Sequence, residues 1–136
     1  MPLEFVDTNI LIYVHDSTAG TKRQISATLI QRLARDSEGA LSTQILIEFY
    51  AAVTKKYGMR NEEAVAVIAD FGSWTVHRLA HADLLAAAEI LRLYKISWWD
   101  ALVLQSAHAL GCEILWTEDL SHGQRYGSVV VRNPFS

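Results

Sequence analysis

The stretch LEFVDTNILIYV, residues 3–14, is apolar at both ends and is interrupted by the polar residues Asp7, Thr8 and Asn9. The residues before Asp7 predict a short buried strand, and the apolar residues after Asn9 predict a helical turn. An acid, a hydroxyl and an amide therefore stand where the first strand is expected to end. Asp7 could simply cap the helical turn, because aspartate accepts hydrogen bonds from the free N–H groups at a helix start.

Short apolar segments and amphipathic helices alternate along the rest of the chain, without repeats or linkers. Their hydrophobic spacing, and the Gly, Ser and Asn residues between them, set the expected boundaries. Helices are expected over residues 21–35, 43–57, 61–71, 81–94 and 97–110, and strands over residues 3–6, 40–42, 74–79, 113–116 and 128–131.

Some residues have expected local roles in this pattern. Gly39 is expected to close the first long helix, and Asn61 is expected to cap a later one. Leu84, Ala88 and Leu91 are expected to point inward from their helix, because their spacing places them on one face.

The alternation of strands and helices predicts an α/β fold, a three-layer α/β/α sandwich with a mostly parallel central sheet. With 136 residues, of which 51% are apolar, the chain is expected to form one domain over residues 1–136. In such sheets ligands bind beyond the carboxyl ends of the strands. Functional residues are therefore expected at that edge.

The bulk composition restricts the class of protein. The net charge of −3 gives no overall basic character of the kind that many nucleic-acid binders have. Cys112 is the only cysteine, so no internal disulfide is possible, which favours a reducing, cytoplasmic location. Neither an export leader nor a membrane-spanning apolar segment of roughly 20 residues is recognisable. We expect a cytoplasmic protein without a membrane association.

Four acids stand at positions where a cleft is expected, and each also has an ordinary structural interpretation. Asp7 follows the first strand, and Glu48 borders the apolar face of its helix, where a glutamate is usually just solvated. Asp100 lies three residues after Ser97 in a capping-box pattern, S-x-x-D. Asp119 follows a later strand in a polar turn, where acids are common.

A parallel sheet would allow these four acids to converge. Carboxylates within a few ångströms of one another repel and raise each other's pKa unless a cation lies among them. A ligand set made only of oxygens, without His or Cys, indicates Mg²⁺ or Mn²⁺. The residue pattern therefore suggests a divalent metal site.

Four motifs resemble one known family, the PIN-domain ribonucleases, and within it the VapC-type toxins of toxin–antitoxin pairs. These motifs cover nearly the whole chain in the family's order, and they are FVDTNIL, LSTQILIEFY, ISWWDALVLQSAHALGCEIL and WTEDLSHGQRYGSVVVRNPF. The resemblance implies an Mg²⁺-dependent endoribonuclease, with Mn²⁺ as a substitute ion. Its catalytic and metal-binding carboxylates would be Asp7, Glu48, Asp100 and Asp119.

The resemblance also implies supporting residues around those carboxylates. Asn9 and Thr117 match polar positions that usually support the site, and Ser42 matches a hydroxyl at the end of the second strand. The match is ambiguous at TED, where Glu118 and Asp119 are neighbouring acids. The Thr-x-Asp spacing favours Asp119.

Basic and aromatic residues offer contacts for RNA. Without the four acids the net charge of −3 becomes +1, which leaves room for local basic patches. Lys55, Lys56 and Arg60 are candidates for phosphate contacts, although a solvated helix end explains them equally well. Trp98 and Trp99 could stack on unpaired bases, but packing is the better explanation for at least one of them.

The resemblance further implies an RNA substrate, a cognate antitoxin protein and a homodimer. Two other functions stay open on the residues alone. One is a non-catalytic RNA- or protein-binding module with the same fold. The other is a phosphatase with Asp7 as nucleophile, which is disfavoured because Asn9 stands where that class has a second acid.

Overall fold

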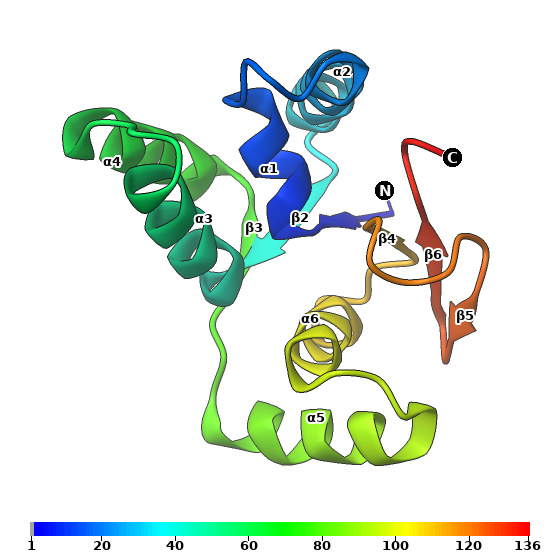
Figure 1. The fold of residues 1–136 in the computed structure, drawn as a ribbon. Coiled ribbons are helices and arrows are strands. Elements are labelled where there is room, and N and C mark those ends of the chain that lie inside the picture. Colours follow the sequence, from blue (N-terminus) through cyan, green and yellow to red (C-terminus); the bar gives the residue numbers. More distant parts are fainter. Residues whose placement is uncertain (1) are drawn as a thin grey trace.

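The computed structural model describes residues 2–136, and in this part of the chain helices alternate with short strands (Figure 1). The strands are β1 (Glu4–Val6), β2 (Gly39–Ser42), β3 (Thr75–His77), β4 (Ile114–Trp116), β5 (Arg125–Tyr126) and β6 (Val129–Arg132). The helices are α1 (Thr8–Val14), α2 (Thr21–Asp36), α3 (Thr43–Lys55), α4 (Asn61–Asp70), α5 (His81–Tyr94) and α6 (Trp98–Ala109), with a 3₁₀ turn, η1 (Phe71–Ser73).

The strands form one sheet in the order β3-β2-β1-β4-β6-β5. All neighbouring strands are parallel except β5, which pairs antiparallel with β6. In Figure 1, α1 and α2 lie on one side of the sheet, and α5 and α6 lie on the other. The prediction of a three-layer α/β/α sandwich with a mostly parallel sheet is confirmed.

Strand β1 lies in the middle of the sheet, and the chain continues to opposite sides of it. From β1 the chain runs to β2 and β3 on one side of it, and later to β4 and β6 on the other. Val6 at the end of β1 is in register with Trp116 at the end of β4. Helices that follow strands on either side of such a point leave a crevice above the strand ends.

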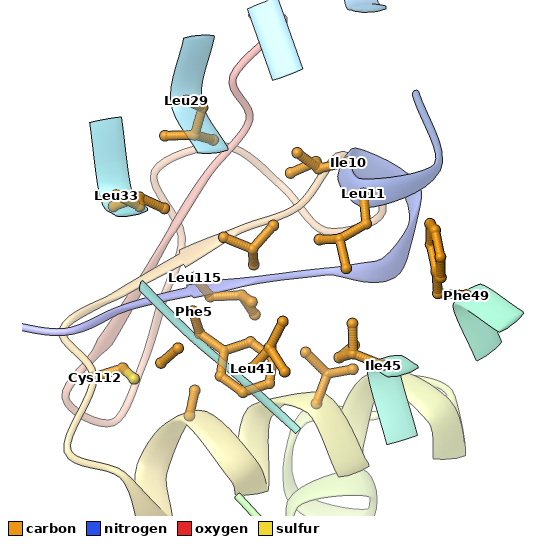
Figure 2. Close-up of a cluster of buried hydrophobic side chains, with 14 of the residues drawn as sticks. Phe5, Ile10, Leu11, Leu29, Leu33, Leu41, Ile45, Phe49, Cys112 and Leu115 are labelled. Carbon is orange, nitrogen blue, oxygen red and sulfur yellow. The ribbon is translucent and has the colours of Figure 1, made fainter. Parts of the chain in front are cut away.

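The core is continuous across the sheet (Figure 2). Phe5 of β1 and Leu41 of β2 are fully buried, and in Figure 2 they lie on the side of α6, whereas Leu29 and Leu33 of α2 lie on the opposite side. Burying each large apolar side chain contributes about 1.5–3 kcal/mol. The burial of these side chains therefore holds the layers together around the sheet.

Two expected helix boundaries were wrong. Helix α2 ends at Asp36, and Ser37 takes the left-handed conformation (φ 55°) that Gly39 was expected to supply. Gly39 instead begins β2. A side chain at this position would clash, because a Cβ would lie 2.5 Å from the ring of Trp74. Asn61 is the first residue of α4 rather than its cap, and its side chain accepts a hydrogen bond from the hydroxyl of Tyr50.

The expected inward face of α5 was also partly wrong. Leu84 and Ala88 are exposed, and the buried residue of this helix is Ala87. Helix α5 packs mainly against α6, and it reaches the sheet only near its ends, where Asp83 contacts His77 and Tyr94 contacts Tyr126. The two-residue strand β5 was not expected, because two residues are too short to show a periodic pattern.

Cys112 is buried, and burial raises the pKa of its thiol to about 12, which agrees with a structural role. Within residues 2–136, no helix combines the length and apolar content needed to cross a bilayer.

Candidate metal centre

Three structural elements bring three of the predicted acids to one end of the sheet. Asp7 directly follows β1, and Asp119 lies in the turn after β4, the strand paired with β1. Asp100 lies in the first turn of α6, where its N–H donates to the Ser97 hydroxyl over 3.1 Å. Parallel strands carry their carboxyl ends to the same edge, so strand pairing and a helix start bring these acids together.

Three of the carboxylates form a compact group. Oxygen atoms of Asp7, Asp100 and Asp119 all lie within 4.8 Å of one another. Asp7 is buried, Asp100 is half-buried and Asp119 is exposed, so the group runs from the interior to the surface. Glu48 of α3 lines the same cavity of about 350 Å³ beside this group.

The buried carboxylate of Asp7 is held by two hydrogen bonds. Its Oδ1 accepts from the N–H of Thr8 over 2.7 Å, and its Oδ2 accepts from the hydroxyl of Thr117 over 2.8 Å. The Thr117 hydroxyl in turn accepts from the N–H of Asp119 over 3.1 Å. The cap predicted for Asp7 is therefore present, and it leaves this acid within the carboxylate group.

Glu48 is held by Thr8, a residue to which the sequence analysis gave no role of its own. The hydroxyl of Thr8 donates to Oε1 of Glu48 over 2.7 Å. Thr8 thus contacts Asp7 through its backbone and Glu48 through its side chain. The only signal in the sequence was its place between Asp7 and Asn9, which does not reveal a partner on a distant helix.

The burial and mutual closeness of these carboxylates raise the pKa values of Asp7 and Asp119. Burial raises the pKa of Asp7 to about 7, with further increases from the charges of Asp119 and Asp100, although its two hydrogen bonds oppose this rise. The pKa of Asp119 is also raised, first by partial desolvation of its carboxylate, although the residue as a whole is exposed, and then by the charges of Asp100 and Glu118. A cation among these oxygens would relieve the repulsion.

The donor set fits a hard divalent cation. The potential ligand atoms of the group are all carboxylate oxygens, which is the type of ligand that Mg²⁺ and Mn²⁺ prefer. Asp7, Asp100 and Asp119 are the residues that could hold such an ion. The exposed side of the group leaves room for water or a phosphate oxygen.

The two neighbouring acids of TED lie in different surroundings. Asp119 joins the carboxylate group, whereas Glu118 binds Lys22 over 2.8 Å and accepts a hydrogen bond from the Tyr13 hydroxyl. The position that the Thr-x-Asp spacing favoured is therefore the one that faces the cavity.

The expected supporting residues are divided between the cavity and the fold. Asn9 lines the cavity, and Thr117 binds Asp7 as described above. Ser42 is fully buried and caps α3 by accepting from the N–H of Ile45 over 3.4 Å. Among the described residues, the cavity lining includes Asn9 but not Ser42, whose hydrogen bond instead fixes the start of α3, the helix that carries Glu48.

The expected basic contacts are divided in a similar way. Lys56 lines the cavity at the end of α3. Lys55 is exposed, and within residues 2–136 it does not line the cavity. Arg60 forms an exposed ion pair with Glu63 over 2.9 Å, and in the described part of the chain it does not line the cavity either.

The two tryptophans before Asp100 have different surroundings. Trp99 is 60% exposed and lines the cavity, whereas Trp98 packs against the smaller core cluster between α5 and α6. Gln44, a residue that sequence reasoning missed, is buried at the cavity wall and donates to the carbonyl of Trp99 over 3.4 Å. No periodic or motif signal singles out this glutamine.

Several solved structures share this fold. A toxin–antitoxin complex from Klebsiella pneumoniae is 19% identical with a TM-score of 0.71, and the match covers 96% of this chain and 97% of that one. VapBC2 from Rickettsia felis, bound to a promoter DNA fragment, is 18% identical with a TM-score of 0.68, covering 96% and 98%. VapC20 from Mycobacterium tuberculosis, a sarcin-ricin loop cleaving toxin, is 19% identical with a TM-score of 0.66, covering 82% and 86%.

Sequence comparison identifies the family. No curated protein matches the sequence. The family model of the PIN domain matches residues 5–126, which contain all four acids and nearly the whole sheet. The chain therefore belongs to the PIN domain family.

Proposed function

We propose that this protein is an Mg²⁺-dependent endoribonuclease and the toxin of a toxin–antitoxin pair. The observation that carries the proposal is the group of three carboxylates within 4.8 Å of one another at the mouth of an open cavity. Membership of the PIN domain family supports the same function. So do the folds of the toxin structures, one of which is a toxin that cleaves the sarcin-ricin loop.

Each acid has a role that its surroundings support. Asp7 and Asp100 would hold a metal ion, and Asp119 and Glu48 would hold waters or a second ion. Bound Mg²⁺ would supply a more acidic water and would neutralise charge on the cleaved phosphate. Thr8 and Thr117 keep the oxygens of Glu48 and Asp7 in place through their hydrogen bonds. Mn²⁺ would substitute for Mg²⁺ with the same oxygen ligands.

The RNA would bind along the same cavity. Lys56 is placed to contact a backbone phosphate, and the exposed ring of Trp99 is placed to stack on an unpaired base. Stacking requires a base outside a double helix, so a single-stranded or looped RNA is the substrate that this cavity favours.

The protein would act with partners. Two of the structures with this fold are named for toxin–antitoxin assemblies, from Klebsiella pneumoniae and Rickettsia felis. An arginine of an antitoxin inserted among the acids would pair with Asp7, Asp100 and Asp119 and would exclude both metal and RNA. We also expect a homodimer, which light scattering of the purified protein would measure directly.

Cleavage of total cellular RNA tests the function. The wild-type protein should shorten RNA with Mg²⁺ and should leave it intact with EDTA, producing 5′-phosphate and 3′-hydroxyl ends. A binding module would leave the RNA intact in both cases, and a phosphatase would release inorganic phosphate without shortening it. A 2′,3′-cyclic phosphate at the new ends would contradict the metal-dependent hydrolysis.

A further inference from the structure

Glu118 is held by Tyr13 of α1 and Lys22 of α2, and both of these residues also contact Phe135. Its Oε2 lies 2.8 Å from Nζ of Lys22, and its Oε1 accepts a hydrogen bond from the Tyr13 hydroxyl. The Lys22 ammonium lies 5.2 Å from the ring centre of Tyr13 and 5.1 Å from that of Phe135. These four residues are called the Glu118 clamp below.

The aromatic part of the clamp is also packed. The rings of Tyr13 and Phe135 meet edge to face with centroids 5.5 Å apart, so the end of the chain lies against α1. A cation over two aromatic rings and beside a carboxylate is held by both interactions. Both oxygens of Glu118 are therefore fixed.

Lys22 occupies a position that helix stability does not explain. It lies in the first turn of α2, which has no acid in that turn and no side-chain cap from Gly20. The N-terminus of a helix carries partial positive charge, so a lysine there is unfavourable for the helix itself. Its favourable contacts all belong to the clamp.

We propose that Lys22 and Tyr13 are positioning residues that hold Glu118 out of the acid group and thereby fix Asp119 in it. This inference rests on the proposed function, because it assigns a role to the clamp in presenting a metal ligand. The turn after β4 carries two adjacent acids, and the clamp decides which of them faces the cavity. The hydrogen bond from the N–H of Asp119 to Thr117 fixes the other side of the same turn.

Removing the charge of Lys22 should cost little folding stability. The Lys22 side chain is 42% exposed, and exposed ion pairs contribute little to folding stability. Replacing Lys22 by methionine keeps much of the aliphatic length and removes the charge. A thermal melt of each variant identifies any that fail to fold.

Metal binding distinguishes positioning from simple charge. Lys22→Met removes a positive charge and Glu118→Ala removes a negative one, so Coulomb forces alone would make the first bind Mn²⁺ more tightly and the second more weakly. If the clamp positions Asp119, both variants bind Mn²⁺ more weakly, by about 10-fold. The double variant is then no weaker than Glu118→Ala alone, because Lys22 acts through Glu118.

Calorimetric titration of the full chain with Mn²⁺, without RNA, measures these affinities. Lys22→Arg should keep the wild-type affinity because arginine retains the pairing, and Tyr13→Phe should weaken binding. Arg92→Met is the matched control, since it removes a cation from the exposed Arg92–Glu89 pair of α5. Wild-type or tighter Mn²⁺ binding by Lys22→Met would overturn the proposal, as would additive effects in the double variant.

RNA cleavage and a crystal structure separate this inference from the proposed function. An active wild type with an equally active Lys22→Met variant refutes the clamp alone. A wild type that cleaves no RNA refutes the nuclease, while the clamp is still tested by the structure of Lys22→Met. In that structure the Asp119 carboxylate should have left the group with Asp7 and Asp100, and an unmoved Asp119 would overturn the clamp.

Discussion

The hydroxyl of Thr117 donates a hydrogen bond to Oδ2 of Asp7 over 2.8 Å, across the ends of the paired strands β1 and β4. The same hydroxyl accepts from the N–H of Asp119 over 3.1 Å. Thr117 is almost fully buried, so this bridge is shielded from water. One side chain therefore sets the relative position of two carboxylates that the sequence separates widely.

Replacing Thr117 by valine should preserve the shape of the side chain and remove the bridge. A buried acceptor that loses its donor is penalised by about 1–3 kcal/mol, so we expect cleavage to fall by about 10- to 100-fold. Initial rates on one RNA at saturating Mg²⁺ measure the loss. Thr117→Ser keeps the hydroxyl and should retain most of the activity; equal rates for the valine and serine variants would contradict a role for the bridge.

The raised pKa of Asp7 predicts a pH-dependent stability in EDTA. The folded protein holds the Asp7 proton up to about pH 7, whereas the unfolded chain loses it near 3.8. Because the folded protein holds this proton more tightly than the unfolded chain does, protonation of Asp7 favours the folded state. Its contribution to the free energy of unfolding is complete below pH 4 and is lost as the pH rises through 7. Asp7→Asn removes the titration, so from pH 4 to pH 8 it should gain about 1–4 kcal/mol of unfolding free energy relative to wild type.

Urea unfolding at several pH values measures this difference. Mn²⁺ should stabilise the wild type at pH 8 and leave the variant unaffected. A difference between the two proteins that stays constant with pH would contradict the titration of a buried Asp7.

Lys56 and Lys55 should differ in their contribution to RNA binding, because only Lys56 lines the cavity in the described structure. Lys56→Ala should weaken binding and should reduce the salt dependence by about one phosphate contact. Lys55→Ala is the matched control from the same helix and should have a smaller effect. Fluorescence anisotropy with Asp7→Asn protein, which keeps the RNA intact, measures both; equal losses would indicate that the helix end acts only by its general charge.

Trp99 should contribute to substrate binding by stacking. Trp99→Ala should raise KM, corresponding to a loss of about 1–3 kcal/mol, and Trp99→Phe should recover part of it because a smaller ring still stacks. Thermal stability should change little, since the ring is 60% exposed. A large loss of stability with unchanged KM would instead assign Trp99 to packing.

The sequence was informative where one local pattern determines the outcome. A buried strand followed by Asp7, and a Ser97-x-x-Asp100 start of a helix, each place an acid at a strand or helix end. Parallel pairing then converts those local positions into one edge of a sheet. The fold class and the convergence of Asp7, Asp100 and Asp119 followed from these features.

The remaining features depend on contacts between distant residues. In the sequence only the Thr-x-Asp spacing separates Asp119 from Glu118, because the contact of Glu118 with Lys22, 96 positions away, is not visible there. Gly39 looked like a helix end, and it is a glycine because the Trp74 ring packs on it. Leu84 was expected to face inward, but α5 packs mainly against α6 through the face that carries Ala87. Periodicity within one segment does not contain this information.

Cleavage of a single defined RNA by wild type and Asp7→Asn, with and without Mg²⁺, tests the central claim most directly. The substitution removes one charge from the acid group and keeps the size of the side chain. We predict rapid cleavage by the wild type with Mg²⁺, none with EDTA, and a loss of nearly all cleavage in the folded variant. Equal cleavage by the two proteins, or cleavage by the wild type in EDTA, would contradict a metal-dependent nuclease built on Asp7.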